Sequence, residues 1–320
     1  MHFPGGHPRR TLSVILPYEA RTFLTIIPFG TISRDCPTQS IFIIANLKSV
    51  CQAPSSVLKG SGSGHSNGIK EVGVKEMAAC EILGIKIEVG EEGALFEKCL
   101  ALVGKGGVIC TPNPLILSAS VENASLRRAL LSAELCIPDG IGLRPYLRAV
   151  DKNAAVLAGV ELGQRLCERV KTVGLIGGRQ GIAERAFSYL QGINPALSPA
   201  FLLSGYGTPL SFLLERLKET KPALCFVCLG SPRQEILMHA LRYYSEKTLF
   251  LGLGGSLDVY AGSVRRAPRP VRAMHLEWLY RMLCEPRRLR NLPTLLRFPI
   301  LCEKHCQKKH KATKISTRNI

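Results

Sequence analysis

Asp139 is well placed for catalysis, because it directly follows the apolar run Leu135–Ile137 and is followed by Gly140 and Gly142. A carboxylate at the end of a strand can meet a substrate, and neighbouring glycines let the substrate approach the backbone closely. Asp139 could therefore act as a general base that removes a proton from a substrate hydroxyl. The alternative is an ordinary turn or helix N-cap, where Asp is also common.

Thr111 and Asn113 follow a second apolar run and alternate with Pro112 and Pro114. The prolines restrict the backbone, so the two polar side chains keep fixed directions and could orient a substrate by hydrogen bonds. The alternative is a helix that begins here, with Asn113 as the N-cap and Pro114 at the first helical position.

Gly177, Gly178 and Gly181 form a glycine-rich turn between an apolar run and a helical pattern. Backbone N–H groups at the start of that helix could bind a phosphate group, or the turn could simply connect strand and helix. A dinucleotide site would favour GxGxxG followed by an acidic residue about 20 positions later. The chain has no acidic residue near Pro195–Ser204, which argues against NAD binding.

A third group lies in the string LGSPRQE, where Gly230 ends an apolar run and Gln234 and Glu235 begin a helical pattern. Ser231 could cap this helix, with Pro232 at its first position, so that the helix N-terminus faces a diphosphate. The alternative is a capping box, in which Ser231 and Gln234 satisfy each other's backbone N–H groups.

Asp258, in the string GGSLDVYAG, could be structural or could line the same pocket. No two Asp residues in the chain are separated by a single residue, so the DxD pattern that would hold a divalent metal on a diphosphate is absent. We therefore predict no metal and no other cofactor.

The cysteine and histidine residues give weak metal-site signals. Cys225 and Cys228 have CxxC spacing, but they lie in an apolar strand-like run where alternate side chains point apart. The span from Cys302 to His310 contains two Cys and two His at a spacing that matches no established zinc finger. We expect the 12 cysteines to be reduced and mostly structural.

Strands and helices must alternate to place these polar groups at strand ends. We expect strands at Glu81–Ile87, Gly107–Cys110, Leu135–Ile137, Thr172–Ile176, Ala223–Leu229 and Thr248–Leu251. We expect helices near Gly90–Leu102 and Leu115–Leu131, and after the glycine turns at Gly178 and Gly230. This alternation predicts an α/β fold with a Rossmann-like, mainly parallel sheet flanked by helices.

The two ends of the chain differ from this body. Residues 1–76 show no sustained hydrophobic periodicity of the helical or the strand kind, and they end in the Gly/Ser-rich stretch Gly60–Gly68. We therefore expect a disordered extension. That extension could lie upstream of the natural translation start, for which Met77 is the candidate. The α/β domain should span 77–271, and 272–320 should form a helical, basic appendage.

Positive charge is concentrated in this appendage. The formal net charge is +18, and the segment from Arg265 onward holds 15 Lys and Arg against 3 Glu, which is +12. Such a tail favours an anionic partner, either a nucleic acid or acidic lipid head groups. We expect no membrane span, because no apolar run reaches about 18 to 20 residues, and no signal peptide, because prolines interrupt the N-terminus.

The motifs together resemble a known family. They are TPNP at 111–114, PDGIG at 138–142, LGSPRQE at 229–235, GGSLDVYAGSVRRAP at 254–268 and LEWLYRMLCEPRRLR at 276–290. In order and spacing, from about Ile82 to Leu296, they are similar to the WecG/TagA/CpsF family of bacterial glycosyltransferases. No nucleic acid partner is then expected.

The resemblance implies an inverting glycosyltransferase that uses a UDP-sugar donor and no metal. By analogy, N-acetylmannosamine moves to N-acetylglucosamine linked to undecaprenyl diphosphate, for teichoic acid or another cell-surface polysaccharide. Asp139 is then the general base, with Thr111 as a second catalytic residue. The implied substrate-binding residues are Asn113, Gly140, Gly177, Gly178, Gly230, Gln234, Glu235, Asp258, Arg281 and Arg288.

The family's appendage is thought to contribute to membrane docking and UDP binding, and Arg281 and Arg288 occupy matching positions. Trp278 and Tyr280 alternate with basic residues, which suits a helix lying at a membrane surface, although a solvated basic face has the same pattern. We therefore expect a cytoplasmic protein that is peripheral on the inner face of the bacterial membrane. It could also assemble as a homo-oligomer.

One motif departs from the family. Where relatives commonly have an arginine, this chain has Val156, so a cation that could neutralise the diphosphate is missing. Arg144 or Arg148 could compensate. Otherwise the chain could be a catalytically impaired relative that binds lipid-linked sugar without turnover.

Overall fold

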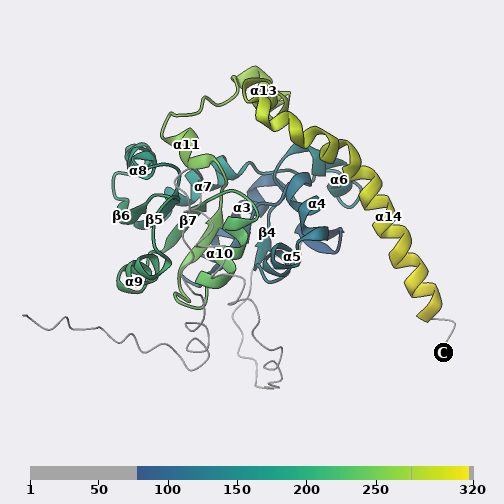
Figure 1. Ribbon diagram of the computed structural model, residues 1–320, viewed down its shortest axis with the longest axis horizontal. Coiled ribbons are helices and arrows are strands. Elements are labelled where there is room, and N and C mark those ends of the chain that lie inside the picture. Colours follow the sequence, from purple (N-terminus) through teal and green to yellow (C-terminus); the bar gives the residue numbers. More distant parts are fainter. Residues whose placement is uncertain (1–77, 275, 317–320) are drawn as a thin grey trace, which may run out of the picture.

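A sheet of six parallel strands forms the centre of the molecule (Figure 1). The computed structural model describes residues 78–274 and 276–316, so the extension predicted for 1–76 lies outside the described residues. The strand order is β4-β3-β8-β7-β5-β6. The strands are β3 (Gly107–Cys110), β4 (Leu135–Cys136), β5 (Thr172–Gly177), β6 (Ser198–Leu203), β7 (Leu224–Cys228) and β8 (Leu249–Gly252).

Helices cover both faces of this sheet, which confirms the predicted α/β class. One face packs against α4 (Pro114–Glu122), α5 (Ala124–Leu131), α9 (Leu210–Thr220) and α10 (Arg233–Leu241). The other face packs against α3 (Glu92–Leu100), α7 (Gly159–Cys167), α8 (Ile182–Ile193) and α11 (Ser256–Tyr260).

Strand β7 shows how the sequence builds these two layers. Cys225 and Val227 belong to the first apolar cluster, whereas Phe226 and Cys228 belong to the second. Alternate side chains of a strand point to opposite faces, so a strand buried on both faces is apolar throughout. The two cysteines of the CxxC string are accordingly separated by the sheet, as predicted. The ten cysteines of the described part are all free thiols.

Two predicted elements were wrong in detail. The segment Glu81–Ile87 is not one strand but an antiparallel hairpin, β1 (Ala79–Ile82) and β2 (Ile85–Glu88). Leu83 and Gly84 both have positive φ, 53° and 78°, which turns the chain between them.

The helix predicted over Leu115–Leu131 is two helices, α4 and α5. Asn123 has an extended backbone at the end of α4, and its side chain accepts a hydrogen bond from Leu126 N at 2.9 Å. One residue therefore ends one helix and caps the next.

The chain runs from β3 to β4 toward one edge of the sheet and from β5 to β6 toward the other. Ligands of open α/β sheets bind beyond the carboxyl ends of the strands, where such a reversal occurs. All five motifs either follow these carboxyl ends or lie in the appendage, so the fold brings them to one edge.

The C-terminal segment is helical, as predicted. After α12 (Arg269–Ala273), the chain forms α13 (Glu277–Cys284), a 3-10 helix η2 (Pro286–Asn291) and the long helix α14 (Leu292–Ser316). Figure 1 shows α14 running from α13 past α4 and α6 (Arg144–Arg148). The rings of Tyr146 in α6 and Phe298 in α14 meet edge to face, with centroids 5.6 Å apart. Within 78–274 and 276–316, no helix combines the length and apolar character that crossing a membrane needs.

Candidate active site

Asp139 lies beyond the carboxyl end of β4 and is held by backbone hydrogen bonds. Its N–H donates to Pro112 O at 3.1 Å, which ties the PDGIG loop to the TPNP loop. Its carboxylate accepts hydrogen bonds from the backbone N–H groups of Gly140 and Gly159. The side chain therefore has a fixed position between the loop after β3 and the first residue of α7.

Burial raises the pKa of Asp139 to about 6. Arg281 lowers this pKa, Glu277 raises it, and the backbone hydrogen bonds from Gly159 and Gly140 lower it. A carboxyl group with a pKa near 6 is mostly ionised at neutral pH but holds a proton more readily than an ordinary Asp. Such a value suits a general base.

Close packing of glycines shapes the surroundings of Asp139. A Cβ atom on Gly142 would lie 2.7 Å from Pro114 Cγ, so the PDGIG and TPNP motifs are in direct contact. Gly140 has a φ of 85° with open space around its α-carbon. Its backbone conformation, rather than a close neighbour, therefore favours glycine at that position.

The side-chain oxygens of Thr111 and Asn113 form hydrogen bonds within the protein. The buried Thr111 hydroxyl donates to Gly252 O at 2.8 Å, which links the ends of β3 and β8. Asn113 Oδ1 accepts from Leu115 N at 3.0 Å and Ile116 N at 3.1 Å. The predicted alternative, an N-cap with a following proline, is confirmed for Asn113. A substrate contact by either residue stays a prediction.

Gln234 and Glu235 are both buried at the start of α10. Gln234 Oε1 accepts from Gly254 N at 2.9 Å, and Gln234 Nε2 donates to Glu235 Oε1 at 2.9 Å. The predicted capping box with Ser231 is wrong, because the Gln234 side chain instead reaches the loop after β8. Ser231 is also not the N-cap, since α10 begins at Arg233 and the Ser231 side chain hydrogen-bonds to Glu235.

The Glu235 carboxyl group is unusual for its depth. Burial raises its pKa, and Oε2 makes no hydrogen bond within the described part of the chain. Gln234 and Glu235 are thus buried at the start of α10, and a substrate contact by either residue stays a prediction.

The glycine-rich turn after β5 is built by close packing. Gly177 has a φ of 150°, and a Cβ there would lie 2.4 Å from Cys228 O. Gly178 has a φ of 66°, and its carbonyl accepts from Gly205 N at 2.9 Å. Gly230, after β7, has a φ of 72° and open space around it. The strand ends of β5, β6 and β7 therefore form one connected rim.

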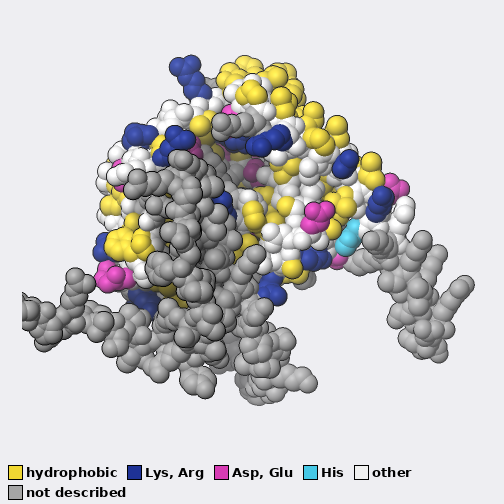
Figure 2. All heavy atoms as spheres, viewed as in Figure 1, with side chains coloured by type: hydrophobic (Ala, Val, Ile, Leu, Met, Phe, Trp, Pro, Cys, Tyr) yellow, Lys and Arg dark blue, Asp and Glu magenta, His cyan; other side chains and the backbone are white. Residues whose placement is uncertain are grey.

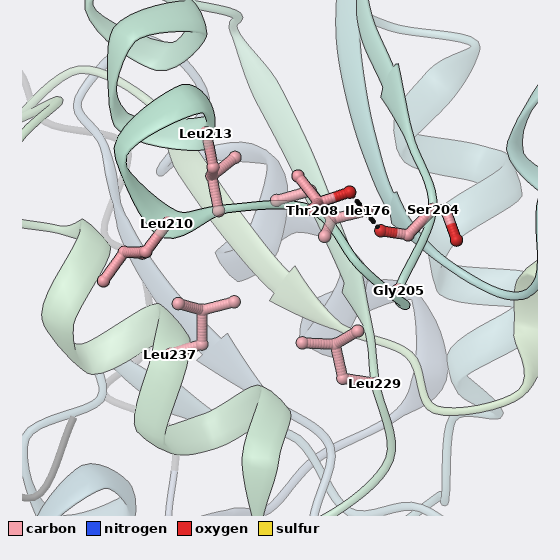
Figure 3. A pocket seen from close by; sticks show the side chains of 8 residues that line it. All are labelled: Ile176, Ser204, Gly205, Thr208, Leu210, Leu213, Leu229 and Leu237. Carbon is pink, nitrogen blue, oxygen red and sulfur yellow. Dashed lines mark hydrogen bonds between the residues drawn. The ribbon is translucent and has the colours of Figure 1, made fainter. Parts of the chain in front are cut away.

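The sequence reasoning missed Tyr206 on this rim, where 58% of its surface is exposed. The loop that carries it is fixed by Thr208 Oγ1, which donates to Ser204 O at 2.8 Å (Figure 3). Beneath the loop lies a small apolar pocket lined by Ile176, Ser204, Gly205, Thr208, Leu210, Leu213, Leu229 and Leu237. The available sequence signal was an aromatic residue between Gly205 and Gly207.

Asp258 lies in α11, between the glycine-rich turn and the appendage. Burial raises its pKa, Arg179 and Arg185 lower it, and Glu285 raises it. Its carbonyl oxygen also accepts hydrogen bonds from two backbone N–H groups of the following turn. The backbone of Asp258 thus has a structural role, and a place in the pocket stays a prediction.

The structure separates the two appendage arginines. Arg281 pairs with Glu277 at 2.7 Å and lies close enough to Asp139 to lower its pKa. Arg288 pairs instead with Glu285 at 2.9 Å, on the side of Asp258. The predicted site residues therefore form two groups, one around Asp139 and one around Asp258.

Val156, at the position of the missing arginine, is partly buried and packs against the apolar cluster on the α4 and α5 face of the sheet. Of the two candidates to replace that charge, Arg148 is exposed at the end of α6. Arg144 is half-buried, with its Nε atom shielded from solvent. Compensation by either arginine stays a prediction.

In the part of the chain that the structure describes, no three His, Cys, Asp or Glu side chains are grouped so that they could hold a metal ion. The prediction of a metal-independent site stands on the absence of a DxD string and stays a prediction.

Comparisons with known proteins agree with the motifs. A model of the Glycosyl transferase WecG/TagA/CpsF family matches residues 80–312. An N-acetylglucosaminyldiphosphoundecaprenol N-acetyl-beta-D-mannosaminyltransferase of Bacillus spizizenii is 30% identical over 206 residues, which cover 63% of this chain and 80% of that protein. A protein of the same name from Bacillus subtilis is 29% identical over 213 residues, covering 65% and 82%.

Proposed function

The chain belongs to the WecG/TagA/CpsF family of glycosyl transferases, and we propose that it transfers N-acetylmannosamine from a UDP-sugar to N-acetylglucosamine on undecaprenyl diphosphate. The names of the Bacillus relatives, which state this sugar and this acceptor, support the proposal. The single structural observation that carries it is Asp139, whose carboxylate is held by the backbone N–H groups of Gly140 and Gly159 beyond the carboxyl end of β4.

The proposed reaction is a single displacement. Asp139 removes the proton from an acceptor hydroxyl while that oxygen attacks the anomeric carbon of the donor sugar. A new C–O bond forms as the bond to the diphosphate breaks, so UDP leaves and the configuration inverts. The raised pKa of Asp139 favours acceptance of this proton.

The leaving diphosphate carries negative charge that the site must stabilise. Arg281 is near enough to Asp139 to lower its pKa, and Arg179 and Arg185 are near enough to Asp258 to lower the pKa of that residue. Preorganised cations near a developing charge are an effective source of catalysis. Tyr206, exposed on the same rim, offers a flat face for a nucleotide base.

The appendage presents an apolar surface that suits a membrane. Exposed large side chains follow one another along α13, η2 and α14: Leu276, Trp278, Leu279, Leu283, Leu289, Leu296 and Ile300. Figure 2 shows yellow side chains gathered over α13 and along α14, with dark blue Lys and Arg beside them. We propose that this surface, the apolar ridge, binds the anionic inner leaflet, where the lipid-linked acceptor is available. The product would serve teichoic acid or another cell-surface polysaccharide.

The test is UDP release from a panel of UDP-sugars with a soluble GlcNAc-diphospho-lipid analogue. Turnover with UDP-N-acetylmannosamine that collapses in Asp139→Asn is the expected result. Turnover with another donor would change the sugar but keep the reaction class. No turnover with any donor, together with binding of the acceptor analogue, would show the impaired relative that Val156 suggests.

A further inference from the structure

A chain of ion pairs joins the appendage to the α/β body beside Asp139. Glu161, in the first turn of α7, accepts from Arg266 Nη2 at 2.7 Å. Arg266 Nε lies 3.8 Å from Glu277 Oε1, and the same Glu277 oxygen accepts from Arg281 Nη2 at 2.7 Å. Arg281 acts on Asp139 electrostatically.

This series of ion pairs forms a closed path, because its last step runs through the backbone of α7. Gly159, at the start of α7, donates its N–H to the Asp139 carboxylate. Glu161 lies two residues later on the same helix. The path from Asp139 through α7, Arg266, Glu277 and Arg281 therefore returns to Asp139.

The ion pairs of this ring are partly shielded from water. The side chains of Arg266, Glu277 and Arg281 are 22%, 24% and 25% exposed. Shielded pairs interact more strongly than pairs at an open surface. The ring can thus hold side-chain positions that solvent would otherwise randomise.

One N–H donor of the Arg281 guanidinium has no acceptor among the described residues. Its Nη2 atom is bound by Glu277, whereas its Nε atom is buried and has no hydrogen-bond partner among the described residues. A buried donor without an acceptor is costly. A phosphate oxygen that reached Nε would satisfy it while Glu277 kept its own contact.

We propose that Glu277 is a positioning residue that fixes the Arg281 guanidinium through their 2.7 Å ion pair, with Nε left for an oxygen of the donor diphosphate. This role rests on the proposed function, because it concerns the same donor. It is separate from proton removal by Asp139, since Glu277 affects donor binding through Arg281.

The two groups act on Asp139 in opposite directions, which makes the proposal testable without turnover. Glu277 raises the pKa of Asp139, and Arg281 lowers it. Arg281→Gln should therefore raise the pKa of Asp139. In that Arg281→Gln background Glu277→Gln should lower this pKa, whereas in the parent the displacement of Arg281 should offset part of the fall.

The first experiment is a carbon-13 NMR titration of the full chain labelled in its Asp carboxyl groups. The chain has only four Asp residues, at positions 35, 139, 151 and 258, so Asp139→Asn assigns the signal. Glu303→Gln, at an exposed position of α14, is the matched control and should leave the pKa of Asp139 unchanged. An equal fall in the pKa of Asp139 when Glu277→Gln is introduced into the parent and into Arg281→Gln would overturn the proposal, because Arg281 would then have kept its position without Glu277.

The second experiment is a kinetic double-mutant cycle. Glu277→Gln should reduce kcat/KM for the donor about tenfold, because a misplaced catalytic group loses much of its effect. In an Arg281→Gln background the same change should cost little, since Glu277 acts through Arg281. Glu277→Asp, which keeps the charge, should restore part of the rate. Equal losses in both backgrounds would show a general structural role and reject positioning.

These two experiments separate the proposals. If the parent chain has no turnover with any donor, the proposed function fails, while the titration still decides whether Glu277 and Arg281 act on Asp139. If turnover is normal and the cycle is additive, the positioning role alone fails.

Discussion

The Thr111 hydroxyl donates a hydrogen bond to the carbonyl oxygen of Gly252 at 2.8 Å, although 141 residues separate them in the chain. This contact joins the end of β3 to the end of β8, the two central loops of the site. Thr111 is 5% exposed, so no solvent replaces the bond if it is lost. The arrangement of the carboxyl edge therefore depends on a buried hydroxyl.

Replacing Thr111 by Val tests this relationship. The substitution keeps the shape but leaves Gly252 O without its donor, which should cost about 1–3 kcal/mol of unfolding free energy. Urea unfolding measures this loss. Thr220→Val, at a half-buried hydroxyl that donates within α9, is the control and should cost less. Equal stability of Thr111→Val and the parent would contradict the bracing role.

Asp139→Asn should lower activity and raise stability at the same time. The folded pKa of Asp139, about 6, lies above its ordinary value of 3.8. A raised folded pKa contributes stability below about pH 4, and that contribution is lost as the pH rises through about 6. Above pH 7 the ionised carboxylate costs about 1–3 kcal/mol, which the neutral amide avoids.

Thermal unfolding at pH 7.5 and pH 4 tests this expectation. Asp139→Asn should raise the melting temperature at pH 7.5 and change it little at pH 4. The rate constant of the parent should rise with pH and level off above about 6, and Asn should reduce it about 10²–10⁴-fold. A variant both less active and less stable at pH 7.5 would indicate disrupted folding instead.

The sequence predicted the central sheet well because its strands are buried on both faces and read as apolar runs. It missed β6 because that strand lies at the sheet edge, where Ser198 and Pro199 are exposed. An edge strand needs fewer apolar residues. The hairpin was missed because its turn contains Leu83, which rarely adopts a positive φ.

Within the site, the sequence located residues but not their partners. Asp139 could be recognised from its place after an apolar run. Its electrostatic interaction with Arg281, 142 residues later, depends on how the appendage folds back, which no local pattern reports. Gln234 is similar: helix-start spacing suggested Ser231 as its partner, but packing placed it against Gly254.

Two glycines give a matched pair of stability predictions. Gly177→Ala places a Cβ 2.4 Å from Cys228 O at a φ of 150°. It should therefore lower the free energy of unfolding by about 1–3 kcal/mol. Gly192→Ala, in α8 with nothing within 4 Å, should stabilise by about 0.5–1 kcal/mol. Urea unfolding compares them, and similar effects of the two variants would contradict the proposed crowding at Gly177.

Turnover should persist after metal removal, because arginines rather than a divalent ion are proposed to stabilise the diphosphate. UDP release in excess chelator should match the rate in its absence. Restoration of a lost rate by added magnesium would show that the diphosphate is held by metal, despite the missing DxD string. Arg281→Gln should lose activity in both conditions.

The apolar ridge predicts which surface variants detach the protein from lipid. Leu283, in α13, is 71% exposed, and burial of such a side chain contributes about 1.5–3 kcal/mol. Leu283→Asp also adds a negative charge that anionic lipid repels, so vesicle flotation should show at least about tenfold weaker binding to anionic vesicles. Tyr243 is similarly exposed, at 69%, but it lies between α10 and β8, on the side of the sheet where the amino ends of the strands lie. Tyr243→Asp should therefore bind almost like the parent. Equal losses in both variants would mean that net charge, rather than the ridge, controls binding, and retention of both would place the membrane surface elsewhere on the molecule.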